Sequence, residues 1–276
     1  MKKIPQDIIG NIALLKFPRR TLWLTKKLKA RKFLKQHKGV ETVLEKTEGF
    51  SGELRTMKTK HLAGIKTKEA TYKENECTFK FNVDESYFSP RLSNERKVIA
   101  DEINKLVKIN EPAPTNNKNK SVKVSKILVM FAGISPYPIV IARRLKLAKK
   151  KAKIISNELN EQANKESERN IKLNRFQDYI TLVNGDAKKL PTKIKEKQDI
   201  ILMPRPNLKE TFLKTALKLS KKGTTIFYHG FGTKEEVIKE IKRDTIGKIG
   251  KISIRKAGDI GPYAYRWQAS FKVLIN

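Results

Sequence analysis

Residues 127–137 read ILVMFAGISPY, an apolar run that gives way to glycine, serine and proline. Such a run is typical of a buried strand, and the small residues after it predict a tight turn into a helix. Gly133 lies in this turn, where a ligand can come close to the backbone at the carboxyl edge of a sheet. The segment therefore predicts the first strand and a ligand-binding turn of an α/β fold.

Strand and helix signals alternate from residue 124 onward, as they do in a parallel sheet covered by helices. Besides the strand at 127–131, apolar or β-branched runs predict strands at 153–157, 180–184, 199–203 and 224–229. Aromatic and apolar residues at alternate positions near the C-terminus predict a last strand at about 265–275. Residues 124–276 are therefore expected to form one α/β domain.

The first part of the chain, residues 1–106, mixes shorter strand and helix signals. Strands are predicted at 7–15, 40–44 and 78–83. Ser89 before Pro90 is typical of a helix start, and this helix is expected to reach about residue 106. The polar, proline-interrupted residues 107–123 have no periodicity and predict a linker between two domains.

Another helix is predicted at 24–36. We expect Leu24, Leu28 and Leu34 to face inward, and the lysines and arginines among them to face outward. The basic face is either an ordinary solvated surface or a surface that faces nucleic acid, and the sequence leaves both open.

The whole chain is strongly basic. It has 61 Lys and Arg against 28 Asp and Glu, a formal net charge of +33, and the basic residues are spread along its length. This balance favours a polyanionic partner such as nucleic acid and, because like charges repel, a monomer. A lysine-rich composition bias is the alternative, although such a bias normally raises Glu together with Lys.

The sequence gives no support for metal sites, disulfides or membrane spans. Cys77 is the single cysteine, and the three histidines, His37, His61 and His229, lie far apart, so we expect neither a disulfide framework nor a zinc site. No apolar run approaches the roughly 20 residues that span a bilayer, and the N-terminus lacks the apolar region of a signal peptide. We therefore expect a cytoplasmic protein that binds neither metal nor membrane.

Acidic residues follow the next two predicted strands of the second domain. Glu158 comes shortly after the second strand, where an acidic side chain typically accepts both ribose hydroxyls of a bound nucleoside, and Asp186 follows the third, where it could accept from an adenine amino group. Ordinary turns or helix caps are the alternative. Because Ser135 replaces the second glycine of a phosphate-binding motif, a nucleoside cofactor without phosphates, S-adenosyl-L-methionine, fits better than a dinucleotide.

The fourth strand of this domain ends at Pro204-Arg205-Pro206. Prolines cannot donate backbone hydrogen bonds and hold the chain extended, so the loop is expected to form a stiff wall beside the cofactor. A simple strand stop is the alternative interpretation.

Several motifs resemble those of the archaeal and eukaryotic tRNA (guanine-37-N1) methyltransferases. They are KHLAG at 60–64, FSPRL at 88–92 followed by Glu95-Arg96, MFAG at 130–133, NIKLN at 170–174 and GDA at 185–187. The SPRL element is fairly specific, because the related aminocarboxypropyl transferases of wyosine synthesis have a different sequence there. The resemblance covers nearly the whole chain.

This resemblance implies an α/β fold of two domains. Residues 124–276 would form a Rossmann-like class I methyltransferase domain, with a mostly parallel seven-stranded sheet whose last strand is antiparallel. Residues 1–106 would form a smaller α+β domain that docks tRNA. The implied activity is transfer of a methyl group from S-adenosyl-L-methionine to N1 of the guanosine 3′ to the anticodon.

The resemblance also implies the site residues. The expected cofactor-binding residues are Arg96, Phe131, Gly133, Glu158, Leu159, Asp186, Ala187 and Pro204. Arg91 and Pro206 are the expected catalytic residues. In the family, the arginine that matches Arg91 is thought to act on the target guanine, where a guanidinium would stabilise the charge that builds on O6 as the N1 proton leaves. The candidates for the general base are Glu158 and water.

The chain departs from the family pattern in two places. Family members usually have Asn-Leu-Pro or Asn-Pro-Pro where this chain has Pro204-Arg205-Pro206, so the Asn side chain expected near the methionine moiety and the target base is missing. Many archaeal members also carry a small extra N-terminal domain, whereas this sequence is expected to begin in the second one. The alternatives are therefore a bifunctional or wyosine-precursor methyltransferase, and a non-catalytic tRNA-binding homologue.

Overall fold

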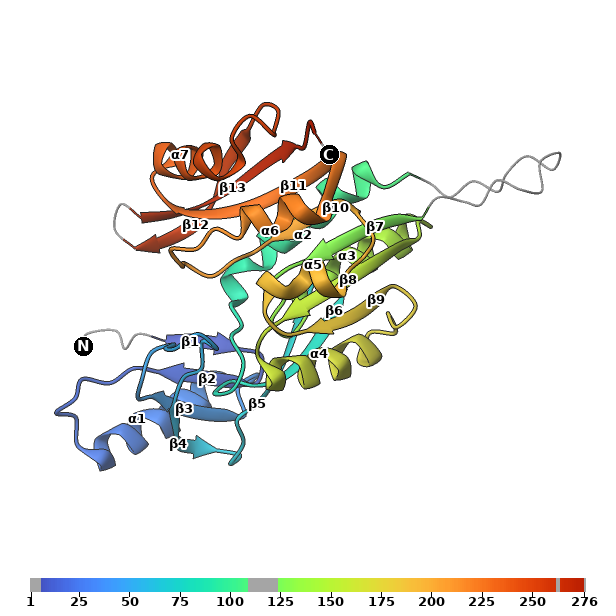
Figure 1. Ribbon diagram of the computed structural model, residues 1–276. Helices are drawn as coiled ribbons and strands as arrows, with labels where there is room; N and C mark the ends of the chain where they lie inside the picture. The colour runs from blue at the N-terminus through green and yellow to red at the C-terminus, as the bar shows by residue number, and fades with distance from the viewer. Residues whose placement is uncertain (1–5, 109–123, 262–263, 276) are drawn as a thin grey trace.

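The computed structural model describes residues 6–108, 124–261 and 264–275. Figure 1 shows a smaller sheet with one helix at the lower left and a larger sheet with helices above it. The predicted linker at 107–123 lies almost wholly outside the described residues and stays a prediction. None of the described helices is long and apolar enough to cross a membrane.

The larger sheet has seven strands in the order β12-β13-β11-β10-β7-β8-β9. Its strands are β7 Ser125–Val129, β8 Ala152–Glu158, β9 Ile180–Asn184, β10 Gln198–Met203, β11 Ser220–Gly232, β12 Ser253–Gly261 and β13 Ala264–Lys272. β13 is antiparallel to both of its neighbours, and the other pairs are parallel. The predicted fold class is therefore confirmed, although the polar edge strand β12 was not predicted.

Alternate residues of these strands feed two cores on opposite faces of the sheet. In β7, Ile127 and Val129 belong to one core, whereas Leu128 and the following Met130 belong to the other. The first core is shared with α2 Ser93–Leu106, α3 Pro136–Leu147 and α4 Glu161–Leu173. The second is shared with α5 Leu190–Lys193, α6 Leu213–Leu219 and α7 Lys234–Thr245. This arrangement leaves the carboxyl ends of the parallel strands free for a site.

The smaller sheet has four strands in the order β1-β2-β3-β4. They are β1 Gln6–Ile9, β2 Ile12–Leu15, β3 Thr42–Lys46 and β4 Thr59–Gly64. The single strand predicted at 7–15 is wrong, because the chain turns back at Gly10 and Asn11. A Cβ on Gly10 would lie 1.8 Å from the Thr71 carbonyl oxygen, and the Asn11 side chain accepts from the Thr71 N–H at 2.8 Å.

The helix α1, Trp23–Gln36, covers this sheet, but not with the face that the sequence predicted. Leu24 and Leu28 are 73% and 65% exposed, whereas Ala30 and Phe33 are buried. The expected inward orientation of Leu24 and Leu28 is therefore wrong, and only Leu34 packs against the core. The leucine spacing was misleading because the buried face of the helix is formed by Ala30 and Phe33 instead.

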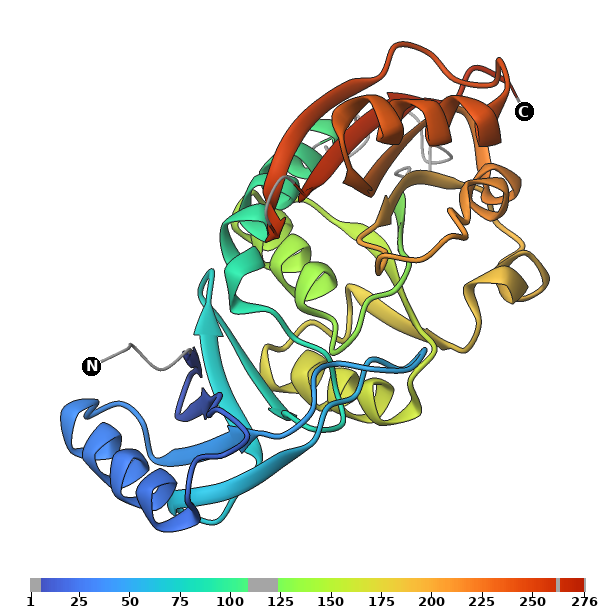
Figure 2. The same cartoon turned by 90° about the vertical axis from the view of Figure 1, so that its left-hand side faces the viewer.

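A hairpin links the two sheets. Its strands are β5 Glu69–Glu74 and β6 Cys77–Asn82, and it is followed by a 3₁₀ turn at Pro90–Leu92 that leads into α2. Although these segments lie before residue 106, β6 packs against α4 and α2 packs along α3 (Figure 2). The hairpin therefore shares the core of the larger sheet.

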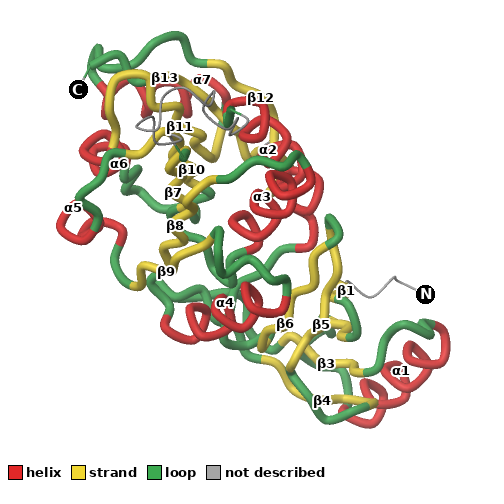
Figure 3. Tube along the Cα trace, turned by 90° about the vertical axis from the view of Figure 1, so that its right-hand side faces the viewer, coloured by secondary structure: helices red, strands yellow, loops and turns green. Residues whose placement is uncertain are grey.

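In the described sheets β6 pairs only with β5, and α4 lies beside its other edge (Figure 3). The backbone N–H groups of Thr78, Lys80 and Asn82 donate to side-chain oxygens of α4 and its C-cap, at 2.9, 2.8 and 2.7 Å. The acceptors, in the same order, are Asn174, Asn170 and Glu166. Two of them are the asparagines of the NIKLN motif at 170–174, so this motif has a structural role.

We predict that Asn170→Ala destabilises the protein by about 1–3 kcal/mol, because Asn170 is fully buried and its loss leaves the Lys80 N–H without an acceptor. Urea denaturation measures the change. Lys172→Ala is the matched control, since Lys172 lies on the same helix and forms an exposed pair with Glu168, worth about a few tenths of a kcal/mol. Equal stability of Asn170→Ala and the parent would contradict the role of the ladder.

A second prediction concerns Glu166, whose pKa is raised by burial. A raised pKa in the folded state means that stability is present at low pH and lost as the pH rises above the usual value for glutamate, about 4.3. Glu166→Gln stays neutral and keeps an acceptor for the Asn82 N–H, so it should be more stable than the parent at pH 7–8 and equally stable near pH 4.

Thermal melts of both proteins across pH 4–8 test this expectation. Glu168→Gln is the control, because its exposed carboxylate has a pKa lowered by Lys172 and its loss should weaken the protein slightly at neutral pH. A constant difference between Glu166→Gln and the parent across the pH range would show that charge at Glu166 has no effect.

Candidate active site

A cavity of about 1100 Å3, including the space open to solvent, lies at the carboxyl ends of β7, β8, β9 and β10. Its other wall comes from the segments 53–55 and 87–96 in the first part of the chain. All predicted site residues except Arg91 line it: Arg96, Phe131, Gly133, Glu158, Leu159, Asp186, Ala187, Pro204 and Pro206. The cavity is therefore shared between the two parts of the chain.

The turn after β7 is held in an unusual backbone conformation. Phe131, Gly133 and Ser135 all have positive φ angles, +55°, +56° and +64°. Ser135 is fully buried, and its hydroxyl lies 2.8 Å from that of Ser156 and 2.6 Å from that of Ser167. The contacts among these buried hydroxyls hold Ser135 in its positive-φ conformation, at the position where a glycine-rich motif would have its second glycine.

Glu158 ties this turn to the end of β8. Its Oε2 accepts from the Gly133 N–H at 2.7 Å, and its Oε1 accepts from the N–H groups of Leu159 and Asn160, both at 2.9 Å. A carboxylate has about four acceptor positions, so three are already in use. The remaining capacity suits one further donor from a ligand, and the three backbone bonds argue against Glu158 as the general base.

Asp186 both caps a turn and lines the cavity. Its Oδ1 accepts from the Lys188 N–H at 2.8 Å, which is the capping role that the sequence left open. Nearby, the Asn157 amide donates to the carbonyl oxygens of Val183 and Gly185, each at 2.8 Å. The ends of β8 and β9 are therefore fixed relative to each other.

Arg96 organises the opposite wall. It is 2% exposed and forms a two-pronged ion pair with Glu74 of β5, with 2.6 Å between its Nη2 and the second carboxylate oxygen. Its Nη2 also donates to the Ser89 carbonyl oxygen at 3.0 Å, and its guanidinium lies over the Phe88 ring. Arg96 therefore holds the wall through Phe88 and Ser89.

Glu95 precedes Arg96 but is not among the residues that line the cavity. Its carboxylate accepts from His229 Nε2 at 3.0 Å and from Arg255 Nη1 at 2.6 Å, which ties α2 to β11 and β12. Burial acts to raise the pKa of Glu95, but these two partners outweigh it and hold the pKa below its usual value. Burial lowers the pKa of His229, so a neutral imidazole donates from Nε2.

Arg91 lies elsewhere. Its Nη2 donates to Asp7 Oδ1 of β1 at 2.6 Å, and its side chain is 78% exposed. An exposed pair of this kind contributes only about 0–1 kcal/mol. The catalytic role expected for Arg91 stays a prediction, and this arrangement gives it no support.

Two arginines that the sequence analysis did not single out, Arg55 and Arg266, also line the cavity. The Arg55 guanidinium lies 4.3 Å from the centroid of the Tyr87 ring, and its buried Nε has no hydrogen-bond partner among the described residues. Arg266 of β13 stacks on Phe231 at 5.0 Å. Arg55 falls in a stretch without periodicity, so nothing in the sequence pattern marked it.

Asn160 was also missed, although it joins both walls. Its Oδ1 caps α4 by accepting from the Gln162 N–H at 2.9 Å, and its Nδ2 donates to the Glu85 carbonyl oxygen at 2.8 Å. An Asn before a helix is a recognisable cap, but the bond to Glu85 depends on the tertiary fold. Within residues 6–108, 124–261 and 264–275, no group of three or more His, Cys, Asp or Glu could hold a metal ion.

Residues 70–254 match the family model described as the TRM5/TYW2 methyltransferase domain. The chain belongs to the TRM5/TYW2 methyltransferase family. The predicted family is therefore confirmed, and the match includes both walls of the cavity apart from residues 53–55 and Arg266.

Two curated relatives extend the likeness over nearly the whole chain. A protein of Nanoarchaeum equitans named tRNA (guanine(37)-N(1))/4-demethylwyosine(37)-methyltransferase Taw22 is 34% identical over 315 residues, which cover 94% of this chain and 96% of the relative. The tRNA (guanine(37)-N(1))-methyltransferase Trm5b of Pyrococcus abyssi is 29% identical and covers 97% of this chain and 74% of the relative.

Solved structures agree with the fold. The crystal structure of Pyrococcus abyssi Trm5b has a TM-score of 0.76 with 28% identity, and the match covers 98% of this chain and 75% of that one. The structure of aTrm5 in complex with tRNALeu has a TM-score of 0.78 with 23% identity, and covers 99% and 72%. This TRM5/TYW2 family member therefore shares its two-part architecture with both solved structures.

Proposed function

We propose that this protein is a tRNA (guanine-37-N1) methyltransferase that uses S-adenosyl-L-methionine. One observation carries the proposal: in a TRM5/TYW2 family member, two acceptor carboxylates and a proline-bounded loop face a guanidinium-bearing wall across a single cavity. The first side suits a nucleoside cofactor and the second suits a purine with developing negative charge. The names of the relatives agree with this activity.

The cavity fits the cofactor. Glu158 and Asp186 offer acceptors for ribose hydroxyls and an adenine amino group, and Leu159 and Ala187 offer apolar contacts beside them. The Gly133 N–H already bonds Glu158, so it is not free to bind a phosphate. S-adenosyl-L-methionine would supply an electrophilic methyl group on its sulfonium.

The target base would meet the opposite wall. Loss of the N1 proton moves negative charge onto O6 of guanine, and a cation aimed there stabilises the transition state. Arg55 is the better placed candidate, because it lines the cavity with an unpaired buried Nε, whereas Arg91 would first have to leave Asp7. Pro206 has no donor and would act through the shape of the wall.

The partner would be tRNA, bound by the protein as a cytoplasmic monomer. The net charge of +33 favours a polyanion, and a relative of the same fold has been solved with tRNALeu. Residues 1–106 would dock the tRNA, and the guanosine would leave its stack to enter the cavity. The boundaries of the docking part, the linker and the methyltransferase part belong to this proposal.

Methylation of a wyosine precursor is the second candidate. It is favoured by the Nanoarchaeum equitans relative, whose name includes 4-demethylwyosine, and by Pro204 at the position where the family usually has asparagine. The same cavity would serve both substrates.

The proposed activity predicts that a tRNA transcript with guanosine at position 37 gains 1-methylguanosine when incubated with protein and S-adenosyl-L-methionine. Mass spectrometry of the released nucleosides measures it. A transcript with adenosine at position 37 is the control, and tRNA carrying 4-demethylwyosine tests the second candidate. Tight tRNA binding without methyl transfer to either substrate would instead indicate a non-catalytic homologue.

The two arginines give a separate prediction. Arg55→Ala should lower kcat/KM for methyl transfer about 100-fold or more, the usual effect of removing one group that stabilises a developing oxyanion. Arg91→Ala, which removes the exposed pair with Asp7, should stay within about threefold of the parent. Cofactor affinity, measured by calorimetry without tRNA, should not change in either variant. A larger loss for Arg91→Ala than for Arg55→Ala would restore Arg91 as the residue that acts on guanine.

A further inference from the structure

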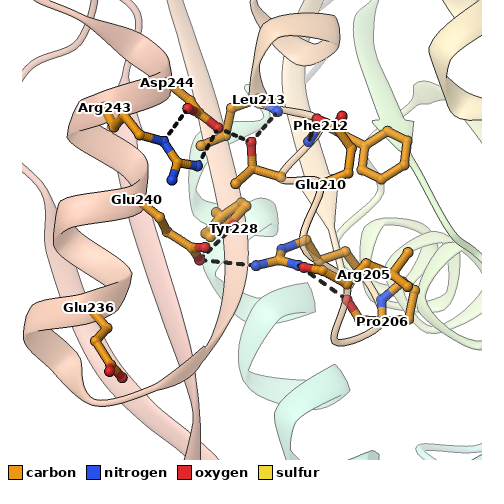
Figure 4. Close-up of polar contacts among 12 residues, drawn as sticks. Arg205, Pro206, Glu210, Phe212, Leu213, Tyr228, Glu236, Glu240, Arg243 and Asp244 are labelled. Atoms are coloured by element: carbon orange, nitrogen blue, oxygen red, sulfur yellow. Dashed lines mark hydrogen bonds and ion pairs between the residues drawn. The ribbon is translucent and has the colours of Figure 1, made fainter.

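The loop after β10 contains a buried arginine. Arg205 is 2% exposed and lies between Pro204 and Pro206, and all three residues line the cavity. Arginine is almost never fully buried unless its charge is paired. Figure 4 shows its side chain running away from the loop toward α7. The residue therefore connects the cavity wall to an element outside the cavity.

Its guanidinium bonds both the loop and α7. Nη1 donates to the carbonyl oxygens of Pro206 and Leu208, at 3.3 and 2.8 Å, and Nη2 donates to Glu240 Oε1 at 3.0 Å (Figure 4). The flat group also lies 5.0 Å from the centroid of the Tyr228 ring. The Arg205 side chain thus fixes the position of the loop relative to α7.

The acceptor on α7 is itself held. Tyr228 of β11 donates its hydroxyl to Glu240 Oε1 at 2.8 Å, and burial raises the pKa of this phenol, so it remains a donor. The Glu240 side chain is 22% exposed, so the ion pair is mostly shielded from water. Glu240 Oε1 thus accepts from two donors, Arg205 and Tyr228, in a site mostly shielded from water. Such an arrangement fixes the position of the Arg205 side chain better than an exposed ion pair would.

The prolines limit how the loop can be anchored. Pro204 and Pro206 have no N–H, so the loop offers mainly carbonyl oxygens through which it can be anchored. The Arg205 guanidinium supplies the missing donors. Farther along, the Thr211 hydroxyl bonds Asp244, so the segment between β10 and α6 is attached to α7 at two points (Figure 4).

We propose that Arg205 is a positioning residue that fixes the Pro204–Pro206 wall in its ligand-binding position before the cofactor arrives. The idea rests on the proposed function, because the wall matters only if the cavity binds S-adenosyl-L-methionine. Arg205 lines the cavity, but it acts through Pro204 and Pro206, since both of its terminal nitrogens, Nη1 and Nη2, bond the loop carbonyls and Glu240. A wall that is ordered in advance reduces the conformational entropy lost when the cofactor binds. This gain in affinity compensates in part for the contact that the missing asparagine would make.

Arg205→Leu tests the proposal, because it removes the donors but keeps an apolar side chain of moderate size. Calorimetry should show S-adenosyl-L-methionine binding weakened about tenfold or more in the absence of tRNA, whereas the Kd for tRNA should change less than about threefold. Hydrogen exchange of the amides at 207–210 should become faster in the free protein. Lys239→Leu is the matched control, since this lysine lies on α7 next to Glu240 but is exposed, and its loss should leave cofactor binding unchanged.

Conservative variants separate positioning from folding. Arg205→Lys keeps the charge but loses the forked geometry, and Glu240→Gln keeps an acceptor but loses the charge, so both should be intermediate between the parent and Arg205→Leu. In a double-mutant cycle, Glu240→Leu should add little to Arg205→Leu, because both remove the same bond. If Arg205→Leu does not fold, Arg205→Lys and Glu240→Gln decide the question by the same two binding measurements.

Several outcomes would overturn the proposal. A folded Arg205→Leu with the cofactor affinity of the parent removes the positioning role, and so does an equal loss of cofactor and tRNA affinity, which indicates general damage. If Arg205→Leu fails to fold, cofactor affinity equal to that of the parent in both Arg205→Lys and Glu240→Gln would also remove the positioning role. A parent protein that does not bind S-adenosyl-L-methionine at all would refute the proposed function instead, so the two failures are distinguishable.

Discussion

The attachment of β6 to α4 is the constraint on which the cavity depends. Successive acceptors on the helix are four residues apart and successive donors on the strand are two apart. Four helical residues rise about 6 Å and two strand residues about 6.6 Å, so the two rows stay in step over three bonds. A helix can therefore replace a neighbouring strand, and the hairpin is held in register on the larger sheet.

The rest of the cavity follows from that attachment. With the hairpin in place, Glu74 of β5 meets Arg96 of α2, and Arg96 in turn holds Ser89 and Phe88 at the cavity. Breaking such a buried pair by removing one partner is strongly destabilising, so these segments should form and unfold together. The cavity is therefore a product of both parts of the chain, because neither has both walls.

Local patterns could predict most strands of the larger sheet, but neither its polar edge strand β12 nor the contacts between distant segments. The strand at 180–184 and the acidic residues at strand ends follow from periodicity and turn chemistry, because their neighbours lie close in sequence. The orientation of Arg91 depends on Asp7, and the turn at Gly10 depends on the Thr71 carbonyl oxygen. Arg55 lies in no periodic segment, so only the fold brings it to the cavity.

The cofactor side of the cavity is built to keep its shape without a ligand. Phe131 and Ser135 adopt positive φ angles that cost roughly 1–3 kcal/mol each for residues other than glycine. Packing of Phe131 on Phe212 and the hydroxyl contacts of Ser135 hold these conformations in the free protein. The free-energy cost of these backbone conformations is therefore met on folding and not on binding, and the Arg205 bonds fix the loop after β10 in the same way. A preformed cavity of this kind binds its ligand with little further loss of conformational entropy.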